Sequence, residues 1–381
     1  MLNPRTPLLI AWLLLTPFVA RAVIPLPLSL TQPPEHLSYQ AWPVMSPLPA
    51  PEGLRPCCAF GYNLHAQLLG IAVPFYQLDN VMTPDSTGYH HYNDSLMRGL
   101  INLMGIGDEH NGIIYTSHGG FIDTAHVRDS ADMTVYLFSQ LQARLGQTFR
   151  LQLSDELARR QIQFRAFTPP PSAKQRYALS AWLAARLAFQ LAAWHEIAQW
   201  YGFESVPGFP EGVSAFSPED LYSNLLGTRI AVALILTGQT ASREQYDSAM
   251  AQGLHEALIQ LGGQPASATR FHFDMLDGRW WNSRRRLPEK YLVRQRNYSV
   301  SDQRFPTPVP GEQAKPWRLS LPHRWQHYRL EQLAQLQLLP GKQMARLARP
   351  KLNYRAADFP RLASYAQRSD SAYCHAWPGR C

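Results

Sequence analysis

The longest regular segment of the sequence is a helix that we expect to begin at Ser172 and to continue to Tyr201. Three prolines at 169–171 stop regular structure before it, and Gly202 offers a left-handed cap at its end. At 1.5 Å per residue such a helix spans roughly 45 Å, the length of a central scaffold element. Alanines recur every four residues over 184–192, which lets a second helix approach closely. Because leucine and tryptophan cover much of the remaining surface, we expect this helix to be buried.

Short strands are expected before this helix. Residues 149–153 and 161–167 alternate or cluster as strands do, and a helix capped at Ser154 is expected between them. An apolar run at 113–115 indicates a further strand, which a Gly-Gly turn at 119–120 separates from the next helix. These strands are too few and too short to form the main part of the protein.

Further helices are expected after it. Ser217 as N-cap, a proline at the first helical position and Asp220 form a capping box that opens a helix rich in Leu, Ile and Ala. Another amphipathic helix begins at Thr240 or Ser242, and a short one covers 330–338. Four or more helices with a few short strands predict a mainly helical α+β fold.

The first 22 residues have the layout of a secretory signal peptide, with an early charge at Arg5, an apolar core over 8–20 and Ala-Arg-Ala before Val23. An uncleaved anchor is the alternative, because a membrane span needs about 20 apolar residues and the core is only somewhat shorter. Pro17 and the Ala-x-Ala ending favour cleavage. We therefore expect a periplasmic or secreted protein with no later transmembrane segment.

Composition divides the remaining chain into three parts. Residues 23–56 are Pro-rich and irregular, 57–263 form the helical body, and 264–381 form an Arg/Trp/Pro-rich extension packed on it. The chain has 36 basic and 28 acidic side chains, a formal charge of +8, with basic residues concentrated in 284–296 and 315–355. Such a surface could approach an anionic envelope lipid or glycan, although a solvated basic face is the simpler explanation. No nucleic-acid-binding motif accompanies the charge.

Four cysteines form an even set, so export favours disulfide bonds among Cys57, Cys58, Cys374 and Cys381. A bond between the two adjacent cysteines would be strained, because their Cα atoms lie about 3.8 Å apart. We expect one or two bridges from Cys57 and Cys58 to the tail. The alternative is a nucleophilic thiol at Cys58 with His126 as its base.

The polar helix after the Gly-Gly turn carries His126 three residues after Asp123 and three before Asp129. Residues three apart share one face of a helix. Asp123 is well suited to be the N-cap, and the helix dipole favours a neutral imidazole in the first turn. A neutral histidine can bind zinc or act as a general base.

His195-Glu196 is the first half of an HExxH zinc motif, but Gln199 stands where the second histidine belongs. A metal site therefore needs ligands from elsewhere in the chain. We expect zinc on His126, His195, Asp129 (or Asp132) and Glu219 (or Asp220), with one position open to water and Glu196 as base. Other residues expected to line the same pocket are Asp123, Arg128, His118, Asp220 and Asn224.

This arrangement predicts a metal-assisted hydrolase. The competing interpretation is a buried His–carboxylate network that fixes helix packing without catalysis, in an envelope protein that binds a lipid, a glycan or a protein partner. The sequence contains no G-x-S-x-G elbow and no phosphate-binding glycine loop, which disfavours a serine hydrolase and a nucleotide-binding enzyme.

Four segments together resemble a known family: RPCCAFG at 55–61, NGIIYTSHGGFIDTAHVRD at 111–129, HEIAQWYG at 195–202 and SPEDLYSNLLGTRIA at 217–231. They are similar to a bacterial family of exported proteins that is catalogued only as a domain of unknown function. The resemblance covers about residues 40 to 350. It implies export and a single family domain, and it brings no activity, cofactor or catalytic residue.

Overall fold

The computed structural model describes most of the chain, namely residues 30, 42–51, 55, 59–68, 71–93, 107–205, 208 and 210–381. The expected signal peptide, and Cys57 and Cys58 with the thiol proposed there, lie outside the described residues. Among the described helices, none is both long enough and apolar enough to cross a membrane.

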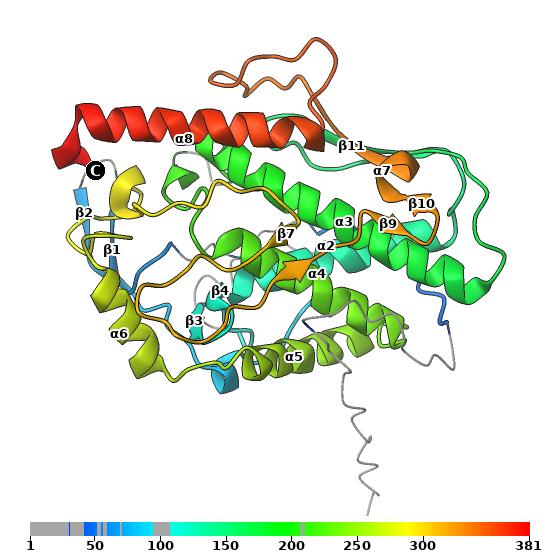
Figure 1. Ribbon diagram of the computed structural model, residues 1–381, viewed down its shortest axis with the longest axis horizontal. Coiled ribbons are helices and arrows are strands. Elements are labelled where there is room, and N and C mark those ends of the chain that lie inside the picture. Colours follow the sequence, from blue (N-terminus) through cyan, green and yellow to red (C-terminus); the bar gives the residue numbers. More distant parts are fainter. Residues whose placement is uncertain are drawn as a thin grey trace, which may run out of the picture.

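Three helices form the centre of the molecule: α2 (Thr124–Gln142), α3 (Ala173–Trp200) and α4 (Asp220–Leu236) (Figure 1). Every residue of α4 is buried, because α2, α3 and α5 (Arg243–Gln260) all contact it. A Cβ atom on Gly227 of α4 would lie 2.0 Å from the carbonyl oxygen of Val127. Only glycine therefore permits this close crossing of α2 and α4.

Antiparallel strands surround the helices. The hairpin of β3 (Ile113–Thr116) and β4 (Gly120–Asp123) leads directly into α2, and Ile113 pairs with Asp123 in its register. A three-stranded sheet has the order β11–β6–β5, and its strands cover Ala334–Leu339, Arg159–Phe164 and Phe149–Gln152. Two-residue strands form the pairs β7–β8 (Gln303–Arg304, Leu319–Ser320) and β9–β10 (Arg324–Trp325, Tyr328–Arg329).

A smaller cluster of buried side chains lies beside α6 (Ala266–Leu276), where Phe60, Phe121 and Phe273 contact one another edge-on or tilted. The nearby hairpin joins β1 (Leu64–Leu68) to β2 (Ile71–Leu78). Short 3-10 turns occur at Pro84–Ser86, Glu211–Val213, Lys290–Leu292, Ala356–Asp358 and Pro378–Arg380.

The fold is mainly helical α+β, as the sequence predicts. The long helix is confirmed from its N-cap Ser172 to Gly202, which has a φ of 101°. Ser242 caps α5 by accepting a hydrogen bond from the Gln245 N–H. The helix expected at Ser154 is wrong, because residues 156–158 form a tight bridge between β5 and β6.

The C-terminal part completes the core. Strand β11 pairs with β6, and α8 (Phe359–Ala376) lies along α3 on the outside of the molecule (Figure 1). The helix expected over 330–338 is wrong in its second half: α7 (Leu330–Leu333) ends where β11 begins. Backbone hydrogen bonds to β6 there outweigh local helix propensity.

The expected disulfides between the two ends of the chain are also corrected. Cys374 and Cys381 bond to each other across a separation of seven residues, with their Cα atoms 5.5 Å apart. This bond links the last turn of α8 to the residues that follow the helix. Neither tail cysteine is therefore available to Cys57 or Cys58.

Candidate metal centre

A buried cluster of one histidine and two aspartates lies where α2 and α4 begin. The Nδ1 atom of His126 is 3.2 Å from Oδ2 of Asp123 and 3.7 Å from Oδ1 of Asp220. One ligand atom from each of the three residues lies within 4.8 Å of the others. This set could bind a metal ion.

Hydrogen bonds between the two helices hold the cluster together. The Asp123 N–H donates to Oγ of Ser223, whose hydroxyl donates to the Glu219 carbonyl. Asn224, expected to line the pocket, lies one turn further along α4: its amide donates to the Asp220 carbonyl and its Oδ1 accepts from Ser130 of α2. Asn224 therefore joins the two helices and is not among the grouped ligands.

Asp123 has two roles. It is the N-cap of α2, as expected, and its Oδ1 accepts a 2.7 Å hydrogen bond from the Ala125 N–H. Its other oxygen faces His126. Because Asp123 is the last residue of β4, the β3–β4 hairpin fixes this carboxylate before the helix begins.

Asp220 differs most from its expected role. The capping box is absent, because α4 begins at Asp220 itself and Ser217 instead donates to both carboxylate oxygens of Glu219. Neither carboxylate oxygen of Asp220 accepts a hydrogen bond from any described residue, although the side chain is fully buried. Burial raises the pKa of Asp220 well above its ordinary value, since the attraction of His126 only partly opposes it.

Two further carboxylates stand beside these three residues. Glu196 of α3 is fully buried; its Oε2 accepts a 2.6 Å hydrogen bond from the Phe216 N–H, and its Oε1 is 3.9 Å from Nε2 of His126. Glu196 therefore faces the opposite ring nitrogen from the aspartates. Burial, and then the charge of Asp123, raise the pKa of Glu219 to about 8.

Two arginines that sequence reasoning missed lie in the electrostatic field of the cluster. Burial lowers the pKa of Arg304 to about 10, while the carboxylates of Glu196 and Asp220 oppose that shift. Burial also lowers the pKa of Arg296, which donates to the carbonyls of Ala215 and Val213 near Glu196. Both come from the C-terminal part of the chain, far from the candidate motifs, so no local spacing indicates them.

His195 does not join this cluster. Its Nδ1–H donates to the carboxylate of Glu156, which also accepts from Arg160. Burial works against a charged imidazole, but the attraction of Glu156 outweighs it and raises the pKa of His195. The expectation of a ligand pair made of His126 and His195 is corrected, because His195 points to the β5–β6 connection.

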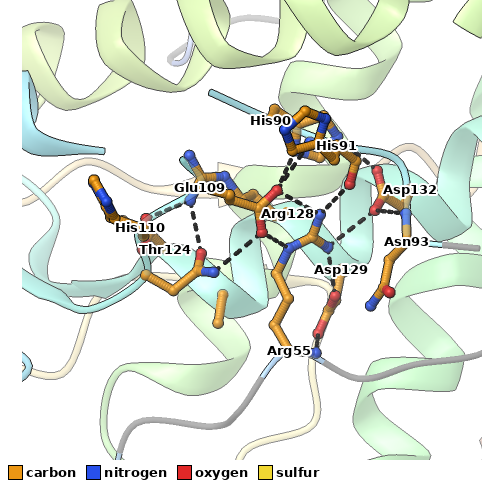
Figure 2. Close-up of polar contacts among 12 residues, drawn as sticks. Arg55, His90, His91, Asn93, Glu109, His110, Thr124, Arg128, Asp129 and Asp132 are labelled. Atoms are coloured by element: carbon orange, nitrogen blue, oxygen red, sulfur yellow. Dashed lines mark hydrogen bonds and ion pairs between the residues drawn. The ribbon is translucent and has the colours of Figure 1, made fainter. Parts of the chain in front are cut away.

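Asp129 is also placed elsewhere, in an ion-pair network around Arg55 (Figure 2). Arg55 donates to Oδ1 of Asp129 at 2.6 Å, to Oδ2 of Asp132 at 2.9 Å and to Glu109 at 2.5 Å. These carboxylates raise the pKa of Arg55, although its burial acts in the opposite direction. His90 donates to Asp132 from the other side. The carboxylates of Asp129 and Asp132 thus form ion pairs with the guanidinium of Arg55.

Arg128, another expected pocket residue, fixes loops instead. Its guanidinium is fully buried and donates to the carbonyls of Thr87 and Tyr89. It also donates to the carbonyl of His110 (Figure 2). The network of Arg55 and Arg128 therefore ties the segments at 87–93 and 107–111 to the outer face of α2.

The remaining expected residue, His118, holds part of the C-terminal extension. Its Nδ1–H donates to the Lys315 carbonyl at 2.8 Å, and its ring stacks on Trp317 with centroids 4.8 Å apart. It is not among the grouped ligands.

The chemistry of the cluster suits a cation. Two donors bound to one tetrahedral zinc ion lie about 3.3 Å apart, because each bond is about 2.0 Å long. The distances of 3.2 and 3.7 Å from His126 Nδ1 to the aspartate oxygens are close to that value. Three buried carboxylates, those of Asp123, Glu196 and Asp220, lie within 4 Å of one imidazole, and Arg296 and Arg304 are cations in their field.

Comparison with known proteins adds one family. A family model described as "Protein of unknown function (DUF4056)" matches residues 45–310, well over half of the chain. The match contains all the residues of the cluster. Neither the curated proteins nor the solved structures contain a match to the chain.

Proposed function

The chain belongs to the DUF4056 family, proteins of unknown function, and from its buried cluster we propose that it is a metalloprotein that catalyses a metal-assisted hydrolysis. The observation that carries the proposal is the carboxylate of Asp220, which is fully buried beside His126 and accepts no hydrogen bond from any described residue. Burying an ionised carboxylate without partners costs several kcal/mol. A bound divalent cation removes most of that cost.

The ligands proposed are Asp123, His126 through Nδ1, and Asp220. Three nitrogen and oxygen ligands with a fourth position for water are the pattern of catalytic zinc sites, so zinc is the metal we propose. Zinc lowers the pKa of bound water to near neutrality. In ester or amide hydrolysis the water oxygen bonds to the carbonyl carbon, the bond to the leaving group breaks, and the protons end on the leaving group and the new acid.

Glu196 has a different role in this proposal from the one its sequence suggests. It faces Nε2, so it lies behind the ring rather than beside the open position. A carboxylate in that place accepts the N–H of a metal-bound histidine and fixes its orientation. We therefore propose that Glu196 is a positioning residue and not the base.

A structural metal is the second candidate, and burial favours it. His126 is 8% exposed, whereas Asp123, Asp220 and Glu196 are 0% exposed. A substrate could reach the cluster only along the edge of the imidazole, so the hydrolase must act on a small substrate. If none reaches the ion, the metal serves to join α2, α3 and α4.

Metal analysis of the purified full chain tests both candidates. We expect near-stoichiometric zinc in the wild type and in the surface control His255→Ala, and loss of it in His126→Ala and Asp220→Asn. Hydrolysis of small ester and phosphoester substrates that is lost together with the metal supports the hydrolase. Bound zinc without any hydrolysis, but with a chelator-dependent melting temperature, supports the structural role. A metal-free wild type that binds no added zinc overturns both.

We also propose that the chain is exported to the periplasm or secreted, which rests on the charged, apolar and small-residue layout of its first 22 residues. Expression in a Gram-negative host, followed by N-terminal sequencing of the product, tests this. A mature chain that begins at Val23 supports export, and an intact N-terminus in the cytoplasm contradicts it.

A further inference from the structure

A cavity of about 540 Å³ lies at the C-terminal end of the chain and shares no residue with the metal centre. Its lining consists of two groups of residues: Arg285, Glu289, Lys290 and Tyr291 from one segment, and Tyr373, Gly379 and Arg380 from the tail. Its volume is within the range of small-molecule sites, about 300 to 1,000 Å³. Nothing in the metal proposal uses it.

The lining carries an excess of positive charge, with Arg285, Lys290 and Arg380 against Glu289. Arg285 pairs with Glu289 at 3.3 Å, and Lys290 pairs with Asp370 at 2.6 Å. Arg380 lies over the ring of Trp377, 5.2 Å from its centroid, and pairs with no carboxylate in the part of the chain that the structure describes. Its guanidinium is exposed at the rim and can receive an anion.

Aromatic rings form the adjacent wall. Tyr291 and Tyr373 stack with their centroids 5.1 Å apart and their planes 12° from parallel. Tyr373 remains 36% exposed, so its ring offers apolar surface to a ligand. Flat rings beside a free guanidinium suit a ligand that has an apolar face and an anionic group.

The wall is fixed before any ligand arrives. Asp370 of α8 accepts hydrogen bonds from Lys290 at 2.6 Å, Tyr298 at 2.7 Å, Trp200 at 2.8 Å and Tyr291 at 3.2 Å. These bonds hold residues 290–298 against α8. A preformed site loses less conformational entropy when it binds.

The rim is fixed as well. The disulfide between Cys374 and Cys381 closes the tail on itself, and the Arg285 guanidinium donates to the Arg380 carbonyl at 2.7 Å. The backbone that carries the free guanidinium is thereby attached to the opposite wall of the cavity.

We propose that this cavity binds an anionic saccharide, a sugar ring that bears a carboxylate or a phosphate. The guanidinium of Arg380 matches either group with two parallel hydrogen bonds. The C–H face of the sugar lies against Tyr373, while its hydroxyls meet the polar lining. The same sugar could come free in solution or as the headgroup of a glycolipid.

Calorimetric titration of the full chain tests the proposal, with glucuronate and glucose 6-phosphate as probes and with glucose and inorganic phosphate as comparisons. We expect both sugar anions to bind, and glucose and inorganic phosphate to bind at least tenfold more weakly. Vesicles that carry a glucuronosyl lipid, compared with phosphatidylglycerol vesicles of equal charge, distinguish the two sources of the sugar.

Variants locate the site. Arg380→Gln and Tyr373→Ala should each weaken binding of the sugar anions by tenfold or more. Tyr373→Phe keeps the aromatic ring and should bind the sugar anions as the wild type does. Arg361→Gln removes the same charge from the other end of α8, where the side chain is 72% exposed, and should leave binding unchanged. The proposal is overturned if no sugar anion binds, if inorganic phosphate binds as tightly, or if Arg361→Gln weakens binding as much as Arg380→Gln.

Discussion

Asp220 carries the metal proposal at the level of single residues, and Asp220→Asn tests it by stability. The substitution keeps the shape of the side chain and removes its charge. Zinc at 100 times its dissociation constant should raise the free energy of unfolding of the wild type by about 2.7 kcal/mol, since only the folded chain binds it. Thermal unfolding with and without zinc should show this gain in the wild type and not in the variant.

The chelated proteins supply the second half of this test. Without metal, the variant should be at least as stable as the wild type, because its amide no longer places a buried carboxyl group among Glu196, Glu219 and Asp123. A variant that is several kcal/mol less stable in chelator would show that Asp220 stabilises the fold by itself.

The ion pair of His195 and Glu156 should give stability a pH dependence. Glu156 raises the pKa of His195, so the contribution is fully present below the ordinary histidine pKa of about 6.5 and is lost as pH rises through the higher folded value. Chemical denaturation of the wild type and His195→Gln from pH 5.5 to 9 should therefore show a stability difference that shrinks with rising pH.

The opposite trend would contradict this pair. Since Glu156 has a lowered pKa, its own contribution is present above the ordinary glutamate value and is lost only in acid. A stability difference that grows toward pH 9 would mean that His195 is neutral in the folded protein and that Glu156 bonds Arg160 alone.

Single residues also show what the sequence can predict. The N-cap role of Asp123 is predictable because it depends on neighbours in the chain, such as Ala125. Local sequence spacing also predicts a capping box that contains Asp220. This prediction is wrong, because the hydroxyl of Ser217 donates to the carboxylate of Glu219. Where two local arrangements are both satisfactory, packing against α2 decides between them.

At the scale of helices, the crossing of α2 and α4 depends on Gly227. A methyl group there would meet the Val127 carbonyl at 2.0 Å, so the helices must separate. Overpacking of this kind costs about 1 to 3 kcal/mol, occasionally more. We expect Gly227→Ala to lower the free energy of unfolding by at least that amount in urea denaturation, and to weaken metal binding by moving Asp220 away from His126.

Gly212→Ala is the matched control, because its new Cβ would have only an ordinary 3.8 Å contact with the Gln199 carbonyl. It should change the free energy of unfolding by less than about 1 kcal/mol. Equal effects of the two substitutions would mean that the close approach at Gly227 does not determine the helix crossing.

Elements with a strong internal signal are predictable from the sequence, and those that depend on distant partners are not. The helix α3 has a proline stop, an N-cap and a glycine end within its own sequence. Strand β11 has none of these: the alternation of Ala334–Leu339 is short, and the segment forms a strand where it pairs with β6. The connection at 156–158 likewise follows from the β5–β6 pairing and not from its acidic residues.

At the scale of the whole molecule, the C-terminal part belongs to the core. Leu336 and Leu338 of β11 and Phe359 and Leu362 of α8 are buried in the same cluster as α3. The ring centroids of Phe359 and Trp194 are 5.9 Å apart, and Trp194 lies on α3, the helix that also carries Glu196. The family match ends at residue 310 and therefore does not include β11 and α8, which pack against α3.

Truncation after residue 310 should for this reason prevent cooperative folding. The shortened chain would expose β6 and one face of α3, and burial supplies about 25 cal/mol per Å² of apolar surface, while a whole domain is stable by only about 5 to 15 kcal/mol. Circular dichroism during heating should show a broad transition or aggregation.

Truncation after Ala376 is the control: it removes only exposed residues and the disulfide partner Cys381, so the sharp transition should remain. A chain of 310 residues that melts cooperatively and binds zinc would show that the helices hold the metal centre unaided.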